Sequence, residues 1–151
     1  MPRVRMFAAP APLIIVLAVL CVSRPPSAQA ENWPRFRGED GTGLSDQQGV
    51  PVSWSPGDYA WQIELPGFGH SSPIIWEDTL FLTSAIEEGA ARYLHCIDAN
   101  TGEMRWTRSI GLNRSHKHLK NSWASSTPAT DGQQVYVAFA DDDRYTLAAY
   151  D

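Results

Sequence analysis

The feature that most constrains the fold is a segment that occurs twice, 55 residues apart. Residues 71–83 resemble residues 126–138, with Pro73 opposite Pro128. In both copies the proline is followed by a short polar turn and then by an apolar triplet. A repeat of this length is typical of architectures in which one small supersecondary unit stacks on the next. We therefore expect the chain to build the same unit more than once.

Each unit is predicted to consist of short strands. Trp61, Ile63 and Leu65 alternate with polar residues, as in a strand with one buried face. Further runs rich in β-branched and aromatic residues occur at 74–76, 80–83 and 93–97. Turn signals separate these runs, and no stretch from Trp33 onward keeps a helical apolar period. The pattern predicts an all-β fold of four-stranded antiparallel units of about 45–55 residues, which is the arithmetic of β-propeller blades.

The clearest local motif lies between two of these runs. Asp98 can accept hydrogen bonds from the backbone of a tight turn, and Thr101 can add a hydroxyl bond. Gly102 can take the positive φ that such a turn requires. Trp106 then falls on the outgoing strand, where its ring can cover a neighbouring blade. We interpret this turn as a structural device that docks one blade on another.

This stretch resembles the tryptophan-docking repeat of the pyrroloquinoline-quinone-like β-propeller family. Blades of that family carry a pattern near Ala-x-Asp-x-x-Thr-Gly-x-x-x-Trp, and here only Cys96 departs from it. Residues 33–38 resemble the opening of exported bacterial members, and residues 69–73 and 125–128 resemble their inner-strand segments. The resemblance implies a ring of about seven or eight blades.

The chain holds less than such a ring. Residues 31–58 are expected to form a lead-in segment, and residues 59–151 one nearly complete blade and a truncated second. Asp151 stands where Asp98 stands in the first copy, just before the turn would begin. Because a closed propeller needs at least about four blades, we expect an incomplete propeller, an N-terminal fragment with a tendency to self-associate. Association of several chains into one ring is the alternative.

Residues 1–30 are predicted to be a secretory signal peptide. They begin with basic residues, continue with the apolar run 8–22 and end in the small residues 27–30. The apolar run is shorter than the about 20 residues of a spanning helix. A retained anchor and a lipoprotein acylated at Cys21 are the alternatives. Cleavage after Ala30 predicts an exported, periplasmic or extracellular protein with no membrane-spanning segment.

Removal of residues 1–30 makes the chain more acidic. Three of the twelve basic residues and none of the seventeen acidic ones lie there, so nine basic and seventeen acidic residues remain, a formal charge of −8. This charge argues against nucleic acid and anionic lipid as main partners. Cys96 is then the single cysteine, so no intrachain disulfide can form.

The best candidate for contact with a partner is residues 111–121, which we call the basic loop. Its basic and imidazole side chains are Arg114, His116, Lys117, His118 and Lys120. The two histidines could share one face of an extended chain, but zinc needs further ligands and no Cys, Asp or Glu lies nearby in the sequence. Because loops carry function while blades carry packing, we expect this loop to contact a protein partner.

Three other motifs predict no chemistry. The glycine-rich residues 38–43 lack the spacing of a calcium or nucleotide loop. Gly69-His70-Ser71 begins like a hydrolase elbow, but the second glycine is missing. The many tryptophans are more typical of packing between blades than of sugar stacking. No catalytic, cofactor-binding or metal-binding residue is therefore predicted.

Two functions remain open at this point. One is a non-catalytic exported scaffold that binds or assembles proteins, similar in kind to the propeller subunit of the outer-membrane β-barrel assembly machinery. The alternative is the N-terminal part of a quinoprotein dehydrogenase that oxidises alcohols or sugars with pyrroloquinoline quinone and calcium. In alcohol-oxidising members of that class an adjacent cysteine pair often stacks on the quinone, and this sequence has no such pair. We favour the scaffold, for which no cofactor is expected.

Overall fold

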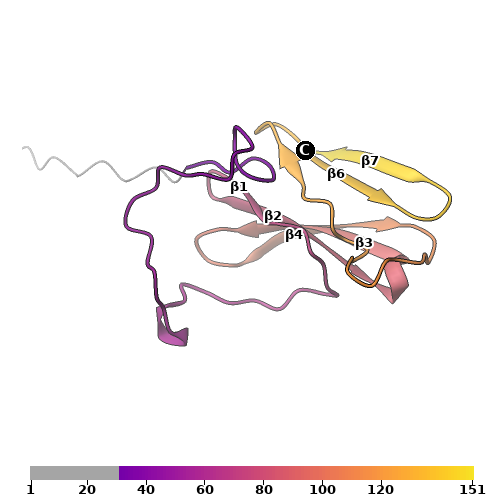
Figure 1. Cartoon of the computed structure of the whole chain (residues 1–151), viewed down its shortest axis with the longest axis horizontal. Helices are drawn as coiled ribbons and strands as arrows, with labels where there is room; N and C mark the ends of the chain where they lie inside the picture. Colours follow the sequence, from indigo (N-terminus) through magenta and orange to yellow (C-terminus); the bar gives the residue numbers. More distant parts are fainter. Residues whose placement is uncertain (1–30) are drawn as a thin grey trace, which may run out of the picture.

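The computed structural model describes residues 31–151; the predicted signal peptide, residues 1–30, lies outside them. The described chain is all-β and forms two antiparallel sheets (Figure 1). The first sheet has the strand order β1 (Ile74–Trp76), β2 (Thr79–Ile86), β3 (Ala91–Asp98) and β4 (Met104–Gly111). The second has the order β5 (Ala129–Thr130), β6 (Val135–Ala140) and β7 (Tyr145–Tyr150). The predicted all-β class is confirmed.

Helix is almost absent from the described residues. It is limited there to two 3₁₀ turns, η1 (Pro56–Asp58) and η2 (Glu87–Gly89). Neither turn, nor any other helix within residues 31–151, has the length and hydropathy of a membrane span.

The register of the strands reproduces the sequence repeat. Ile74 pairs with Phe81 in the first sheet, and Ala129 pairs with Tyr136 in the second. Both members of the pair are shifted by 55 residues, the offset of the sequence repeat. The hairpin β6–β7 continues this correspondence, although its ladder ends at Ala140 and is shorter than the ladder of β2 and β3. The two copies in the sequence therefore fold into the same hairpin.

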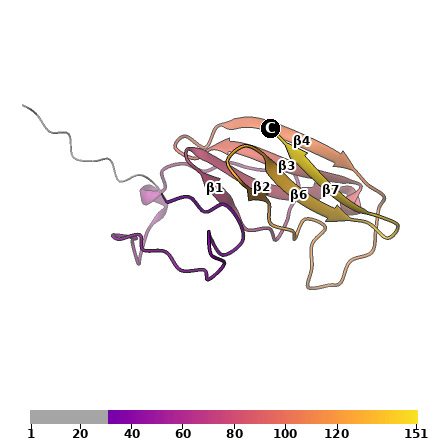
Figure 2. The same ribbon diagram turned by 90° about the horizontal axis from the view of Figure 1, so that it is seen from above.

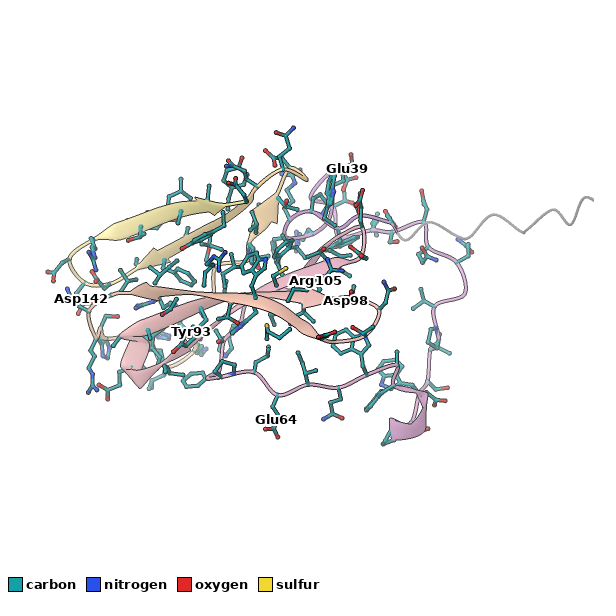
Figure 3. All side chains as sticks on the ribbon, turned by 180° about the vertical axis from the view of Figure 1, so that it is seen from behind. Glu39, Glu64, Tyr93, Asp98, Arg105 and Asp142 are labelled. Atoms are coloured by element: carbon teal, nitrogen blue, oxygen red, sulfur yellow. The ribbon has the colours of Figure 1, made fainter. Side chains whose placement is uncertain are left out.

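The second sheet departs from the predicted four strands. It has three, and the strand predicted at residues 61–65 forms no ladder within residues 31–151. Trp61, Ile63 and Leu65 are nevertheless half-buried, whereas Glu64 is exposed and points away from the sheet (Figure 3). The prediction of a paired strand was wrong because alternation reports which side chains are buried, and not whether the backbone has a partner.

The hydrophobic core lies between the two sheets. Figures 1 and 2 show β6 and β7 lying over one face of the first sheet. Ala85 and Leu94 of the first sheet share one buried cluster with Val135, Val137 and Phe139 of the second. Apolar area shared in this way stabilises both sheets together by about 25 cal/mol per Å² removed from water. Neither sheet therefore has a complete core of its own.

A tryptophan packed on a glycine joins the two sheets at one end. Trp76 ends β1, and its ring lies against Gly132 in the turn between β5 and β6. Gly132 has a φ of +86°, and a Cβ on it would lie 2.5 Å from Cε2 of Trp76. Only a residue without a Cβ allows the ring to approach so closely.

The lead-in segment adds a second connection between the sheets. The backbone of Trp33 exchanges two hydrogen bonds with Ile75 of β1, at 2.8 and 3.0 Å. The next residue, Pro34, accepts a 2.8 Å bond from the backbone N–H of Thr130 in β5. Residues 33 and 34 thereby connect the first strands of the two sheets. This short contact explains why the chain opens with this sequence.

Phe36 does not seat the lead-in segment as its apolar side chain suggests. The ring is 58% exposed. The N–H of Gly38 donates to the carbonyl of Arg35 at 3.0 Å, which places Phe36 at the corner of a tight turn. A corner residue faces solvent, so Trp33 alone packs inward, with its ring against the buried Gly38.

Substitution of Gly132 by alanine tests the contact with Trp76. We expect Gly132→Ala to lower the free energy of unfolding by about 1–3 kcal/mol more than Gly49→Ala, because only the first Cβ meets a ring. Gly49 is a matched control, since its φ is +76° and a Cβ there meets nothing within 4 Å. Urea denaturation of both variants measures the difference, and equal losses would show that backbone strain alone is responsible.

Candidate functional site

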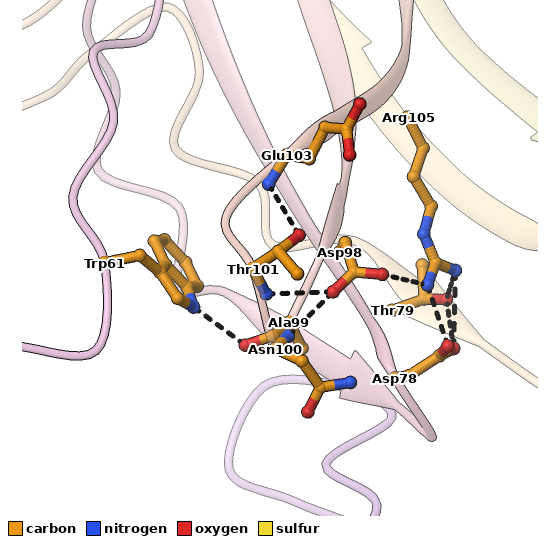
Figure 4. A network of polar contacts seen from close by, with 9 residues as sticks. All are labelled: Trp61, Asp78, Thr79, Asp98, Ala99, Asn100, Thr101, Glu103 and Arg105. Atoms are coloured by element: carbon orange, nitrogen blue, oxygen red, sulfur yellow. Dashed lines mark hydrogen bonds and ion pairs between the residues drawn. The ribbon is translucent and has the colours of Figure 1, made fainter.

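The turn after β3 is held by the residues of the docking motif (Figure 4). Asp98 Oδ1 accepts hydrogen bonds from the backbone N–H groups of Asn100 and Thr101, both at 2.9 Å. The hydroxyl of Thr101 accepts a 3.2 Å bond from the N–H of Glu103. Gly102 has a φ of +75° and donates its N–H to the carbonyl of Asp98 at 2.8 Å. The side chains thus satisfy backbone donors that the turn would otherwise leave free.

The ring that covers this turn belongs to Trp61, and not to Trp106 of the motif itself. Trp61 Nε1 donates to the carbonyl of Ala99 at 2.9 Å. A Cβ on Gly102 would lie 2.6 Å from the same ring. Trp106 lies on β4, packs against the core between the sheets and contacts Phe81 with ring centroids 5.9 Å apart. The motif therefore receives one tryptophan and sends another toward the second sheet.

Arg105 is a member of this site that the sequence analysis did not single out. One of its guanidinium nitrogens lies 2.7 Å from Asp98 Oδ2 and 2.8 Å from Asp78 Oδ2. The other donates to the hydroxyl of Thr79 at 2.7 Å. Arg105 thereby connects the turn after β3 with the turn before β2 (Figure 4). Its position next to Trp106, on the opposite side of β4, is the one signal in the sequence that could have indicated it.

The charges of this cluster stabilise each other. Hydrogen bonds from Arg105, and then from the backbone of Thr101, lower the pKa of Asp98 from 3.8 to about 2. Arg105 also lowers the pKa of Asp78, and the two carboxylates raise the pKa of Arg105. The cluster is at the surface, so salt screens its contribution to stability. Its role is to fix the turn on which Trp61 packs.

The basic loop connects β4 to β5 and is tethered at its start to both sheets. The N–H of Leu112 donates to the carbonyl of Ala90 at 3.0 Å, beside η2 of the first sheet. The N–H of Asn113 donates to Asp141 Oδ2 at 2.8 Å, in the turn between β6 and β7. Farther along, the carbonyl of Ser115 accepts a 2.8 Å bond from Trp123 Nε1. The loop is therefore held in place by its backbone.

The side chains of the basic loop divide into two groups. Arg114 lies 3.7 Å from Glu88, and the ammonium of Lys117 lies 4.9 Å from the centre of the Trp123 ring. His116, His118 and Lys120 are exposed, and Leu119 between them is 93% exposed. Across residues 31–151 no three potential metal ligands come together, so the two histidines have no third ligand there. The loop presents a tip that carries charge and one free apolar side chain.

The remaining motifs of the sequence form local structure. Asp40 Oδ1 accepts bonds from the N–H and the hydroxyl of Thr42 at 2.9 and 2.8 Å. Ser71 Oγ accepts from the N–H of Thr83 at 3.0 Å. The N–H of Ser72 donates at 3.0 Å to the hydroxyl of Thr127, the residue that corresponds to Ser72 in the second copy. Equivalent positions of the two repeats are thus in direct contact.

A buried serine–histidine pair lies inside the first sheet. Ser84 Oγ is 2.8 Å from Nε2 of His95, and Thr107 Oγ1 is 3.1 Å from its Nδ1. The hydroxyl of Ser84 donates to the carbonyl of Pro66 at 2.5 Å. Burial lowers the pKa of His95 and favours the neutral ring. Because the hydroxyl proton is committed to Pro66 and both residues are buried, the pair fixes the chain at Pro66 and presents no nucleophile.

Acid should weaken the protein through the cluster around Arg105. The folded-state pKa of Asp98 is below its unfolded value, so its contribution is complete above pH 3.8 and is lost as the pH falls toward 2. We expect the melting temperature to fall over this range, and Asp98→Asn to make the fall shallower. Asp46→Asn, in an exposed part of the lead-in segment, serves as the control. Parallel curves for wild type and Asp98→Asn, measured by circular dichroism, would contradict the assignment.

Comparison with known proteins leaves the geometry to stand alone. No protein-family model matches the chain, and no curated protein matches it either. The resemblance carried by residues 96–106 therefore remains a prediction from the motif.

Proposed function

We propose that the chain is an exported, non-catalytic β-propeller repeat protein that acts as a binding scaffold. On this proposal each sheet is a blade, and the basic loop is the surface that a partner protein contacts. Export is proposed from the signal sequence of residues 1–30. The observation that carries the proposal is a loop with a tethered backbone and an exposed, charged tip.

The propeller part of the proposal is supported by repetition in three dimensions. Hairpins β1–β2 and β5–β6 have the same register at a shift of 55 residues. Trp61 packs on Gly102 and Trp76 on Gly132, so a tryptophan meets a turn glycine in both sheets. Radial repetition of small antiparallel sheets is the arrangement that propellers use.

The scaffold part of the proposal is supported by the order of the basic loop. The bonds from Leu112, Asn113 and Trp123 fix its backbone before any partner binds. A preorganised loop loses less conformational entropy on binding than a free one. Its tip leaves His118, Leu119 and Lys120 exposed, which is more than folding requires. Binding is the use that such an arrangement serves best.

Charge indicates the kind of partner. The chain after residue 30 has a formal charge of −8, and the basic loop carries three of its nine basic residues. A partner with an acidic surface would be attracted to this loop and repelled by most of the remaining surface. Complementary charge of this kind sets the orientation and the rate of association more than the affinity, and it weakens in salt. We therefore propose a protein partner with an acidic contact surface.

Photo-crosslinking in the organism that makes the protein tests the proposal. A photoreactive residue in place of Leu119 should capture one discrete protein, because the side chain is free and lies at the tip of the loop. The same residue in place of Val52, which is 98% exposed in the lead-in segment, is the positional control. Capture should fall in high salt, since the contact is electrostatic.

A pair of charge variants sharpens the test. Lys120→Gln should reduce capture at position 119 several-fold, whereas Gln47→Glu makes the same change in net charge far from the loop in sequence and should leave capture unchanged. Identical products from positions 52 and 119, or equal effects of the two charge variants, would sink the scaffold proposal. So would a saturable shift in the absorbance of pyrroloquinoline quinone with Ca²⁺, accompanied by dye reduction with an alcohol.

A further inference from the structure

A cavity of about 360 Å³ lies behind the basic loop. One wall is the loop and the residues that follow it, and the other is the end of β6 with the turn toward β7. Asp142, which lines the cavity, lies in that turn (Figure 3). Arg92 of β3 completes the lining from the first sheet. The cavity is therefore formed where both sheets and the loop meet.

Arg92 is the unusual member of this lining because its side chain is 0% exposed. Its Nε donates to the carbonyl of Trp123 at 3.1 Å. Its Nη2 donates to the hydroxyl of Ser115 at 3.2 Å and to the carbonyl of Ala140 at 2.7 Å. Its Nη1 is buried and has no hydrogen-bond partner among residues 31–151. One of the three guanidinium nitrogens is thus held in place with its donors unused.

The charge of Arg92 also lacks a close counter-ion. Within the described residues no carboxylate lies within 4.0 Å of its guanidinium. Asp141 is the nearest candidate along the cavity wall, but its two oxygens already accept bonds from the backbone N–H groups of Asn113, Asp143 and Arg144. An arginine stays protonated in proteins. A buried cation with an unused donor is destabilising unless an anion supplies the missing acceptor.

The rest of the lining favours an anion of single charge. Lys117 adds a positive charge, and Ser122 and Ser125 add hydroxyl donors. Asp141 and Asp142 line the opposite wall and would repel a dianion such as phosphate. A carboxylate carries one charge and accepts a hydrogen bond from guanidinium in its own plane.

We propose that this cavity binds a carboxylate group, with Nη1 of Arg92 as the buried donor and Lys117 as the second charge. One carboxylate oxygen accepts from Arg92, and the serine hydroxyls are available to the other. The group belongs either to a small free carboxylate or to an acidic side chain of a protein. The inference does not rest on the scaffold function, since it requires only that the cavity receives the anion.

Nuclear magnetic resonance of the full chain tests the proposal. Sodium acetate replaces sodium chloride at constant ionic strength, and the Nε–H signal of Arg92 is followed. We expect a saturable shift with acetate and none with acetamide, which has nearly the same shape and no charge. An absent or linear shift, or an equal response to acetamide, overturns the proposal.

Two variants with the same change of charge provide the control. Lys117→Gln should weaken acetate binding about fivefold, whereas Arg114→Gln should leave it unchanged, because Arg114 is outside the lining of this cavity. Arg92→Lys should abolish saturation; if this variant does not fold, the first two variants decide. Equal weakening by Lys117→Gln and Arg114→Gln would show non-specific attraction and contradict the proposal.

The source of the carboxylate is resolved with a short peptide. The peptide contains one glutamate and has blocked termini, so its side chain supplies the single carboxylate. Saturation at a lower concentration than acetate identifies a protein side chain as the ligand. Saturation no better than acetate identifies a small free carboxylate.

Discussion

Packing of tryptophan rings on left-handed glycines is the contact on which the remainder of this structure depends. The two sheets share no strand ladder within residues 31–151, so backbone pairing cannot hold them together. Trp76 instead packs on Gly132, and Trp123 packs on Gly89 beside η2. Each glycine has a positive φ and no Cβ, and both properties are needed for an indole ring to reach the backbone. The same device, Trp61 on Gly102, closes the turn that Arg105 fixes from its other side.

Polar groups with no role in the ladders gather where these joints lie. Arg92 extends from β3 to the carbonyls of Trp123 and Ala140, and so connects the first sheet, the chain after the basic loop and the second sheet. The lead-in segment makes a similar connection through Trp33 and Pro34. A side chain held in this way is costly to bury and is rigid once it is buried. The joints therefore provide both the tethered loop and the cavity, which are the two places where we propose binding.

The sequence predicted what local patterns can specify. Strand β1 was predicted with its observed limits, and the turn residues Asp98, Thr101 and Gly102 make the bonds that their chemistry suggests. Features that depend on a distant partner were missed. Arg92 is charged and yet fully buried, and only its place in alternation with Leu94 on β3 indicated an inward side chain. Phe36 is apolar and yet exposed, because a backbone turn decides its position.

The central claim is that the joints make one cooperative unit of the two sheets. Hydrogen exchange of the backbone amides under native conditions, with low concentrations of denaturant, tests it most directly. The amides of β2, β3, β6 and β7, and that of Thr130, which bonds to Pro34, should exchange with one free energy of opening and one denaturant slope. If β6 and β7 exchange with a lower free energy and a smaller slope than β2 and β3, the sheets unfold separately and the account is contradicted.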